Sequence, residues 1–141
     1  MGPGISFGPP ESADMVLTFR NFHNWVGDPV MEKLLAASFV VLKHGGVLGL
    51  TDHRAAPGTA ADPKVIGDSG YVPEAYVVET IEKAGFKLAG RSEVNANPKD
   101  TKDYPKGVWT LPPTYIQGDQ DRARYQAIGE SDRMTLRFVK P

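Results

Sequence analysis

The chain of 141 residues contains no cysteine, which excludes disulfide bonds, a thiolate metal site and a cysteine nucleophile. It has no apolar run near the ~20 residues that a membrane-spanning helix needs, and its N-terminus has no apolar signal-peptide core. Its formal net charge is only -1, so no excess of positive charge is available to hold nucleic acid or an anionic membrane. We therefore expect a cytoplasmic protein with neither nucleic acid nor membrane as a partner.

The composition is that of one globular domain, with 40% hydrophobic and 23% charged residues. Residues 1–12 are rich in glycine and proline and show no periodicity, with Phe7 as their only aromatic side chain. We predict a flexible tail over residues 1–12, followed by a single domain over residues 13–141.

Strand and helix patterns alternate along this domain. An apolar run bounded by turn residues predicts a first strand, Ala13–Phe19, buried on both faces. Asp28 and Pro29 are typical of a helix start. The remaining predicted elements are a helix from there to Gly45-Gly46, a strand at 47–50, a loop at 55–70, a helix from Pro73 to Gly85, and a strand at 86–93.

The last third of the chain is less regular. Residues 94–115 have no usable period, which in a compact domain is typical of a functional loop or a lid, and we expect the charged part at 99–106 to be solvated. A short helix is predicted at 119–128. Met134, Leu136 and Phe138 then alternate with polar residues, which predicts a half-buried, antiparallel edge strand.

This order of elements predicts an α/β fold in which the first three strands are parallel and joined by right-handed crossovers. Ligands of such sheets bind at the carboxyl ends of the strands. Two polar groups follow neighbouring strands there, and we expect them to converge: Asn21, Phe22, His23 and Trp25 after the first strand, and Asp52, His53 and Arg54 after the second.

Several chemistries are open to these residues. His23 or His53 could act as a general base, with Asp52 fixing an imidazole tautomer, or Arg54 could form an ion pair that braces the loop. The alternative is a histidine and a tryptophan that simply pack in an ordered turn. A metal site made of His23, Asp52 and His53 is conceivable, but the spacing does not favour it, and none is predicted.

Glu93, Asn95 and Trp109 lie in the segments that follow the third strand. Glu93 and Asn95 point toward the same rim in the predicted sheet, although asparagines before proline are also common turn formers. Trp109 begins the segment Trp109-Thr110-Leu111-Pro112-Pro113. This segment is either a rigid aromatic lid or an apolar patch that covers the sheet edge.

Long segments of the chain carry a family resemblance: TFRNFHNW, LGLTDHRA, ANPKDTKD, GVWTLPPT and IGESDRMTLRFVKP. With them the chain resembles the C-terminal half of a class I S-adenosylmethionine-dependent methyltransferase, and in particular a bacterial group of predicted methyltransferases. The resemblance implies a Rossmann-like sheet with strand order 3-2-1-4-5-7-6, helices on its faces and an antiparallel seventh strand. The four strands here would be the fourth to the seventh.

The resemblance also implies roles for the residues at the strand ends. It implies S-adenosylmethionine as cofactor and a small-molecule methyl acceptor as substrate. The implied catalytic residues are His23, His53 and Asp52, those near the cofactor are Asn21, Phe22 and Trp25, and those on the substrate side are Arg54, Glu93, Asn95 and Trp109.

Two family features are missing from this sequence. The cofactor is held mainly by a glycine-rich loop after the first strand and an acidic residue after the second, and no glycine here follows a strand and opens a helix in that way. We therefore expect the acceptor-side half of a methyltransferase, not catalytic as an isolated chain. The alternative is a non-catalytic dimerising or binding module with the same fold, and a metal-dependent hydrolase is a weaker third.

The missing half has a structural consequence for the first strand. Its outer edge, from Asp14 to Phe19, has no partner within the predicted sheet. An apolar unpaired edge is a template for association, and pairing with the same strand of a second copy gives a closed twofold dimer. We therefore expect a homodimer with a continuous sheet through this edge, or one that exchanges its N-terminal tail.

Overall fold

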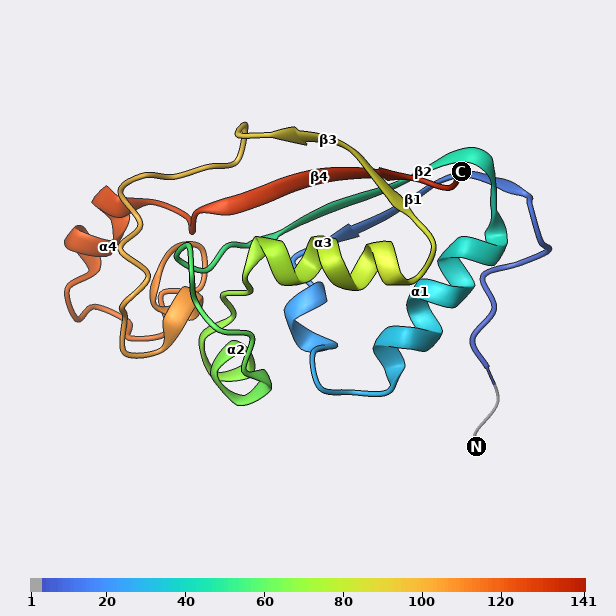
Figure 1. Ribbon diagram of the computed structural model, residues 1–141. Coiled ribbons are helices and arrows are strands. Elements are labelled where there is room, and N and C mark those ends of the chain that lie inside the picture. The colour runs from blue at the N-terminus through green and yellow to red at the C-terminus, as the bar shows by residue number, and fades with distance from the viewer. Residues whose placement is uncertain (1–3) are drawn as a thin grey trace.

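The computed structural model describes residues 4–141, so residues 1–3 of the predicted tail lie outside the described part. Strands and helices alternate over most of its length (Figure 1). The elements are β1 (Ala13–Phe19), η1 (Phe22–Asn24), α1 (Val30–Val41), β2 (Leu42–His53), α2 (Pro63–Ser69), α3 (Glu74–Lys83), β3 (Lys87–Ser92), η2 (Gly107–Thr110), α4 (Arg122–Ile128) and β4 (Arg133–Val139).

The four strands form one mixed sheet in the order β1-β2-β4-β3. β1 pairs parallel with β2, whereas β4 runs antiparallel to both of its neighbours, so β1, β2 and β3 share one direction. The predicted α/β fold, with parallel first strands and an antiparallel last strand, is confirmed. The observed order equals the order 4-5-7-6 that the family resemblance implies for the fourth to the seventh strand. The prediction from hydrophobic alternation that the last strand lies at an edge is wrong, because β4 inserts between β2 and β3.

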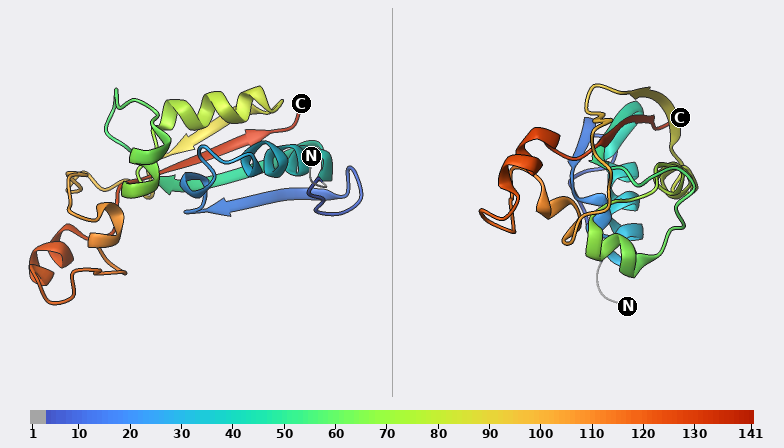
Figure 2. Two further views of the ribbon diagram at one scale, coloured as in Figure 1. Left: turned by 90° about the horizontal axis from the view of Figure 1, so that it is seen from below. Right: turned by 90° about the vertical axis from the view of Figure 1, so that its left-hand side faces the viewer.

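The core lies between this sheet and two helices, α1 and α3. Both helices pack against the same face of the sheet, below it in Figure 1 and in front of it in the left view of Figure 2. Alternate residues of the strands point to this face and are buried, among them Leu48 and Leu50 of β2 and the expected Met134, Leu136 and Phe138 of β4.

The opposite face of the sheet carries no helix in the described part of the chain, and this exposes β1. Met15, Leu17 and Phe19 point to that face and are 55%, 54% and 58% exposed. The prediction that β1 is buried on both faces is therefore wrong. A continuous apolar run predicts burial of a strand in a covered sheet, but it does not say which layers are present.

Several element boundaries differ from those predicted, for local reasons. The Asp28 carboxylate accepts the N–H of Val30 at 2.8 Å, so the expected cap is present. However, α1 passes directly into β2 at Leu42, and the strand is much longer than the predicted 47–50. The segment predicted as a loop contains the helix α2, which Asp62 caps at its N-terminus. This helix is too short to show a hydrophobic period in the sequence.

The described part of the tail is tied to the domain where it joins β1. The N–H groups of Glu11 and Ser12 donate to the carbonyls of Val40 and Val41, both at 2.9 Å. Among the described residues, no helix is both long and apolar enough to cross a membrane.

Candidate active site

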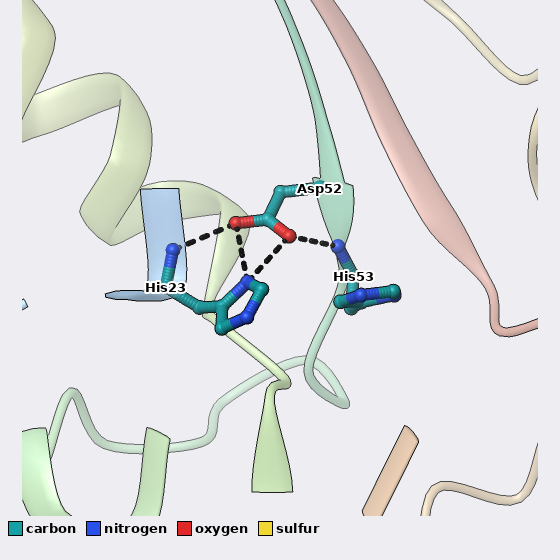
Figure 3. A group of neighbouring side chains, drawn as sticks. All are labelled: His23, Asp52 and His53. Atoms are coloured by element: carbon teal, nitrogen blue, oxygen red, sulfur yellow. Dashed lines mark hydrogen bonds and ion pairs between the residues drawn. The ribbon is translucent and has the colours of Figure 1, made fainter. Parts of the chain in front are cut away.

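A buried carboxylate joins the ends of β1 and β2. His23 lies in η1, just after β1, and Asp52 is the penultimate residue of β2 (Figure 3). The Asp52 side chain is fully buried. Its Oδ2 accepts the backbone N–H of His23 and its Oδ1 accepts that of His53, both at 2.8 Å. The loop after β1 is thereby fixed to the end of β2.

The same carboxylate orients the His23 ring. The distances from His23 Nδ1 to Asp52 Oδ1 and Oδ2 are 2.9 and 3.1 Å. Because an ionised carboxylate only accepts hydrogen bonds, Nδ1 carries the proton and Nε2 presents a lone pair. His23 lines a cavity, so Nε2 is the ring nitrogen available to a ligand there. An aspartate–histidine pair of this kind can act as a general base.

His53 lies beside His23 at the same end of the sheet. The two rings are 5.3 Å apart between centroids. Burial lowers the pKa of His53 to about 4, although the negative charge of Asp52 opposes this shift. His53 is therefore neutral at pH 7, and its Nδ1 forms a hydrogen bond with the hydroxyl of Ser131.

The two histidines face a cavity of about 260 Å³ at this edge of the sheet. Trp109 of η2 forms one wall, with its ring in edge contact with His23 at 6.0 Å between centroids. The remaining lining residues come from the loops and short 3-10 helices around the strand ends: Arg20, Asn24, Val108, Pro112, Pro113, Thr114, Glu130 and Ser131. The cavity is thus polar at its base and carries an aromatic side chain at its wall.

The structure brings the three predicted catalytic residues together, as the sequence led us to expect. The residues predicted on the substrate side do not come together. Trp109 lines the cavity with the histidines, whereas Arg54, Glu93 and Asn95 do not. Asn95 instead donates from Nδ2 to the hydroxyl of Thr135 at 2.9 Å. Glu93 and Arg54 bind each other.

The residues predicted near a cofactor lie around a second cavity, of about 380 Å³, beside β1 and α1. Asn21, Phe22 and Trp25 all contribute to its lining. Phe22 is fully buried and packs against Trp25 and Tyr76, at ring centroid distances of 5.9 and 6.3 Å. Its contribution is therefore chiefly to the core beneath this cavity.

Arg54 organises the ion pairs behind the active site. Its guanidinium contacts Glu93 at 2.8 Å, Asp132 at 3.0 Å and Glu74 at 3.2 Å. Hydrogen bonds from Glu93 and Asp132 raise the pKa of Arg54 further above its usual value, so it stays charged. The predicted ion pair that braces the loop is present, and it links β2 to α3, to the end of β3 and to the start of β4.

Asp132 is the second centre of this network. Burial alone would raise its pKa, but hydrogen bonds from Arg54, from Lys102 and from the N–H of Asn97 lower it to about 2. Lys102 Nζ lies 2.9 Å from the carboxylate. These contacts fix Asp132, the neighbour of Ser131, and so help to hold the hydrogen bond between Ser131 and His53 in place.

The segment at 99–106 was predicted to be solvated, and for Asp100 this is wrong. Asp100 is 7% exposed and accepts the hydroxyl of Tyr71 at 2.9 Å and the N–H of Asp132 at 2.8 Å. Burial, reinforced by the charge of Asp100, raises the pKa of Tyr71. Sequence reasoning also missed Ser131 as a partner of His53, because it falls in a charged turn without a recognisable motif.

Proximity alone would allow a metal ion at the two histidines. One candidate ligand atom from each of His23, Asp52 and His53 lies within 4.8 Å of the others. However, both oxygens of Asp52 already accept N–H groups, and one of these belongs to the His23 ring. This arrangement favours a carboxylate that orients His23 over one that coordinates a metal.

Comparison with known proteins identifies the fold. No protein-family model matches the sequence, and neither does any curated protein. Among solved structures, the [4+2]-cyclase SpnF matches 96% of this chain and 52% of its own, with 15% identity and a TM-score of 0.58. A putative sarcosine dimethylglycine methyltransferase from Galdieria sulphuraria matches 95% of this chain and 55% of its own, with 14% identity and a TM-score of 0.54.

A further match is a SAM-dependent methyltransferase from Aquifex aeolicus, with 14% identity, a TM-score of 0.52, and coverage of 94% of this chain and 48% of its own. The chain therefore has the α/β fold of S-adenosylmethionine-dependent methyltransferases, and it spans about half the length of these structures. SpnF is described as a cyclase, which illustrates that the fold alone does not specify the reaction.

Proposed function

We propose that this chain is the acceptor-side half of an S-adenosylmethionine-dependent methyltransferase and positions a small methyl acceptor against His23. The observation that carries the proposal is the buried Asp52–His23 pair, which leaves Nε2 of His23 as the basic atom available to the cavity. The site lies at the carboxyl ends of parallel strands, where open α/β sheets bind their ligands.

In the proposed mechanism, a hydroxyl or amine of the acceptor gives its proton to His23 Nε2. S-adenosylmethionine, when bound, would supply the methyl group that bonds to the acceptor oxygen or nitrogen, and its sulfur would keep the electron pair of the broken bond. The resulting imidazolium is stabilised by the negative charge of Asp52, which remains hydrogen-bonded at Nδ1. Trp109 and the loop wall restrict the orientation of the acceptor, so the rate gain comes from base catalysis and from positioning. His53, being neutral, adds no competing positive charge.

The described residues do not form a complete cofactor site. The second cavity offers the aromatic rings of Phe22 and Trp25 and one amide, Asn21, but no carboxylate for ribose hydroxyls. The connection from β1 to α1 has a single glycine, Gly27, and the connection from β2 to α2 has a single glycine, Gly58, so neither is a glycine-rich loop. We therefore propose that the isolated chain is not catalytic.

A cytoplasmic location suits a chain without cysteine.

The second candidate function is a binding module that associates through β1. The observation that favours it is the free edge of this strand, beside which Met15, Leu17 and Phe19 are more than half exposed. In this case the aspartate–histidine pair would serve only to fix the loop after β1.

Two measurements test the proposal. Nitrogen-15 NMR of the imidazole rings should show His23 protonated at Nδ1 and unprotonated at Nε2, and a His44→Gln variant identifies the signal of the most exposed histidine and serves as the control. Calorimetric titration with S-adenosylmethionine should show no binding by the isolated chain. A His23 ring protonated at Nε2 refutes the base role, and micromolar binding refutes the assignment as a half-site.

Mass spectrometry of the purified native protein addresses the metal alternative. A stoichiometric transition metal that is lost on substitution of His53 would favour the hydrolase. A metal-free protein with the Nδ1-protonated His23 would favour the acceptor site.

A further inference from the structure

The two outer strands of the sheet differ in how they are protected from association. β3 carries Lys87 and Arg91, and its pairing with β4 is interrupted by a register shift between Leu88 and Gly90. Charges and bulges of this kind discourage pairing of an edge with another chain. β3 therefore has the features of an edge that stays free.

β1 has the opposite character. Over its pairing with β2 it is regular from Met15 to Phe19, and no strand of the described chain pairs with its outer side. In the left view of Figure 2 it forms the open margin of the sheet. Its apolar side chains are exposed where a neighbouring strand would provide cross-strand contacts.

We propose that the outer edge of β1 pairs antiparallel with β1 of a second copy, about a twofold axis that passes through the Leu17 pair. A twofold axis perpendicular to a sheet keeps each face of the sheet on the same side. The apolar side chains of both copies therefore lie side by side, in one strip across the seam.

The register follows from which side chains would meet. With Leu17 opposite Leu17 of the partner subunit, Met15 lies opposite Phe19 of the partner subunit. Every exposed apolar residue of β1 then has an apolar partner. Directly opposite residues in an antiparallel pair point to the same face of the sheet. The two nearest alternative symmetric pairings are therefore shifted by two residues, one in each direction. One of them places Phe19 opposite Ala13 of the partner subunit, and the other places Met15 opposite Asn21 of the partner subunit.

Charge complementarity favours the same register. Asp14 and Arg20 flank the regular part of β1, Arg20 in the turn that follows the strand, so each Asp14 would come near Arg20 of the partner subunit at both ends of the seam. The side chains of Asp14 and Arg20 are 87% and 48% exposed, and their present partners, Lys43 and Glu130, are also exposed. An additional opposite charge can thus be accommodated at each end without breaking a buried interaction.

Disulfide trapping tests the register directly, because the chain has no cysteine of its own. In a Leu17→Cys variant the two thiols would lie on directly opposite residues, with Cα atoms about 4.5–5.5 Å apart, which a disulfide can span. Phe19→Cys is the matched control, since it points to the same face and is similarly exposed. In the proposed dimer, position 19 of one copy is offset by four residues from position 19 of the other, which separates the two thiols by about 14 Å.

The expected results are a dimer of the native chain by light scattering at micromolar concentration, and efficient oxidation of Leu17→Cys but not of Phe19→Cys to a covalent dimer. Asp14→Arg should weaken the dimer, and the double variant Asp14→Arg, Arg20→Asp should restore it. A monomeric native chain overturns the proposal, including the case in which a different polypeptide covers this edge. Equal trapping at both positions overturns the register.

Discussion

Replacement of Asp52 by asparagine is the most direct test of how the active site is built. The Asp52 carboxylate accepts two backbone N–H groups and the Nδ1–H of His23. Asparagine has one carbonyl oxygen and one NH2 group, so in either orientation its NH2 meets a backbone N–H that then has no acceptor. A buried unsatisfied donor costs about 1–3 kcal/mol, and a hydrogen bond to a charged group contributes about 1.5–3 kcal/mol. Asparagine still keeps some of these hydrogen bonds, so the two effects do not add in full. We expect the free energy of unfolding to fall by about 2–4 kcal/mol.

The assay is urea unfolding followed by circular dichroism, with the free energy of unfolding taken from the midpoint and the m-value. Asp68→Asn is the control, because Asp68 is 68% exposed and pairs only with Lys64 of its own helix. Its effect should stay within about 0.5 kcal/mol. In Asp52→Asn, the His23 ring should also lose its fixed Nδ1-protonated form in nitrogen-15 NMR. An Asp52→Asn protein as stable as the control would refute the hydrogen-bond arrangement around this carboxylate.

Two further changes probe the surroundings of this site. The pKa of His53 is about 4 in the folded chain against 6.5 unfolded, so the unfolded state binds more protons between these values. The free energy of unfolding should therefore fall by up to about 3 kcal/mol as the pH is lowered through this window, and His53→Gln should remove most of that slope in pH-dependent urea unfolding. Arg54→Lys should cost about 1–3 kcal/mol in the same assay at pH 7, because lysine cannot reproduce the planar contacts to several carboxylates. Arg91→Lys, an exposed cation 3.9 Å from Glu74, should change stability by less than about 0.5 kcal/mol, and equal effects of the two substitutions would contradict the role of Arg54.

The strand and helix pattern was predictable wherever one face of an element is buried. Alternation at Met134, Leu136 and Phe138 identified both the strand and its buried side, and the antiparallel direction was also right. The position of β4 inside the sheet was not predictable from this pattern. Hydrophobic alternation indicates which face of a strand is buried. Which strands lie beside it in the sheet depends instead on the connections between strands elsewhere in the chain.

The convergence of His23 and Asp52 was predictable for a topological reason. Both follow or end neighbouring parallel strands, and such strand ends meet at one edge of a sheet. Ser131, Asp100 and Lys102 were not identified, because they reach the site through an irregular segment. Their side chains are fixed by individual hydrogen bonds, and no sequence period records such contacts.

The proposed seam and the candidate active site both adjoin β1 and share Arg20, but His23 is held independently of the seam. The strand ends at Phe19, and Arg20 after it adopts a left-handed conformation with φ of 54° and donates its N–H to the carbonyl of Thr51 at 2.7 Å. Beyond this turn, His23 is held from the side of β2, by Asp52, and not through the outer edge of β1. Pairing of that edge would therefore add a strand to the sheet without moving the histidine. The contacts of His23 and Asp52 are already formed in one copy, so association would extend the sheet rather than create this candidate site.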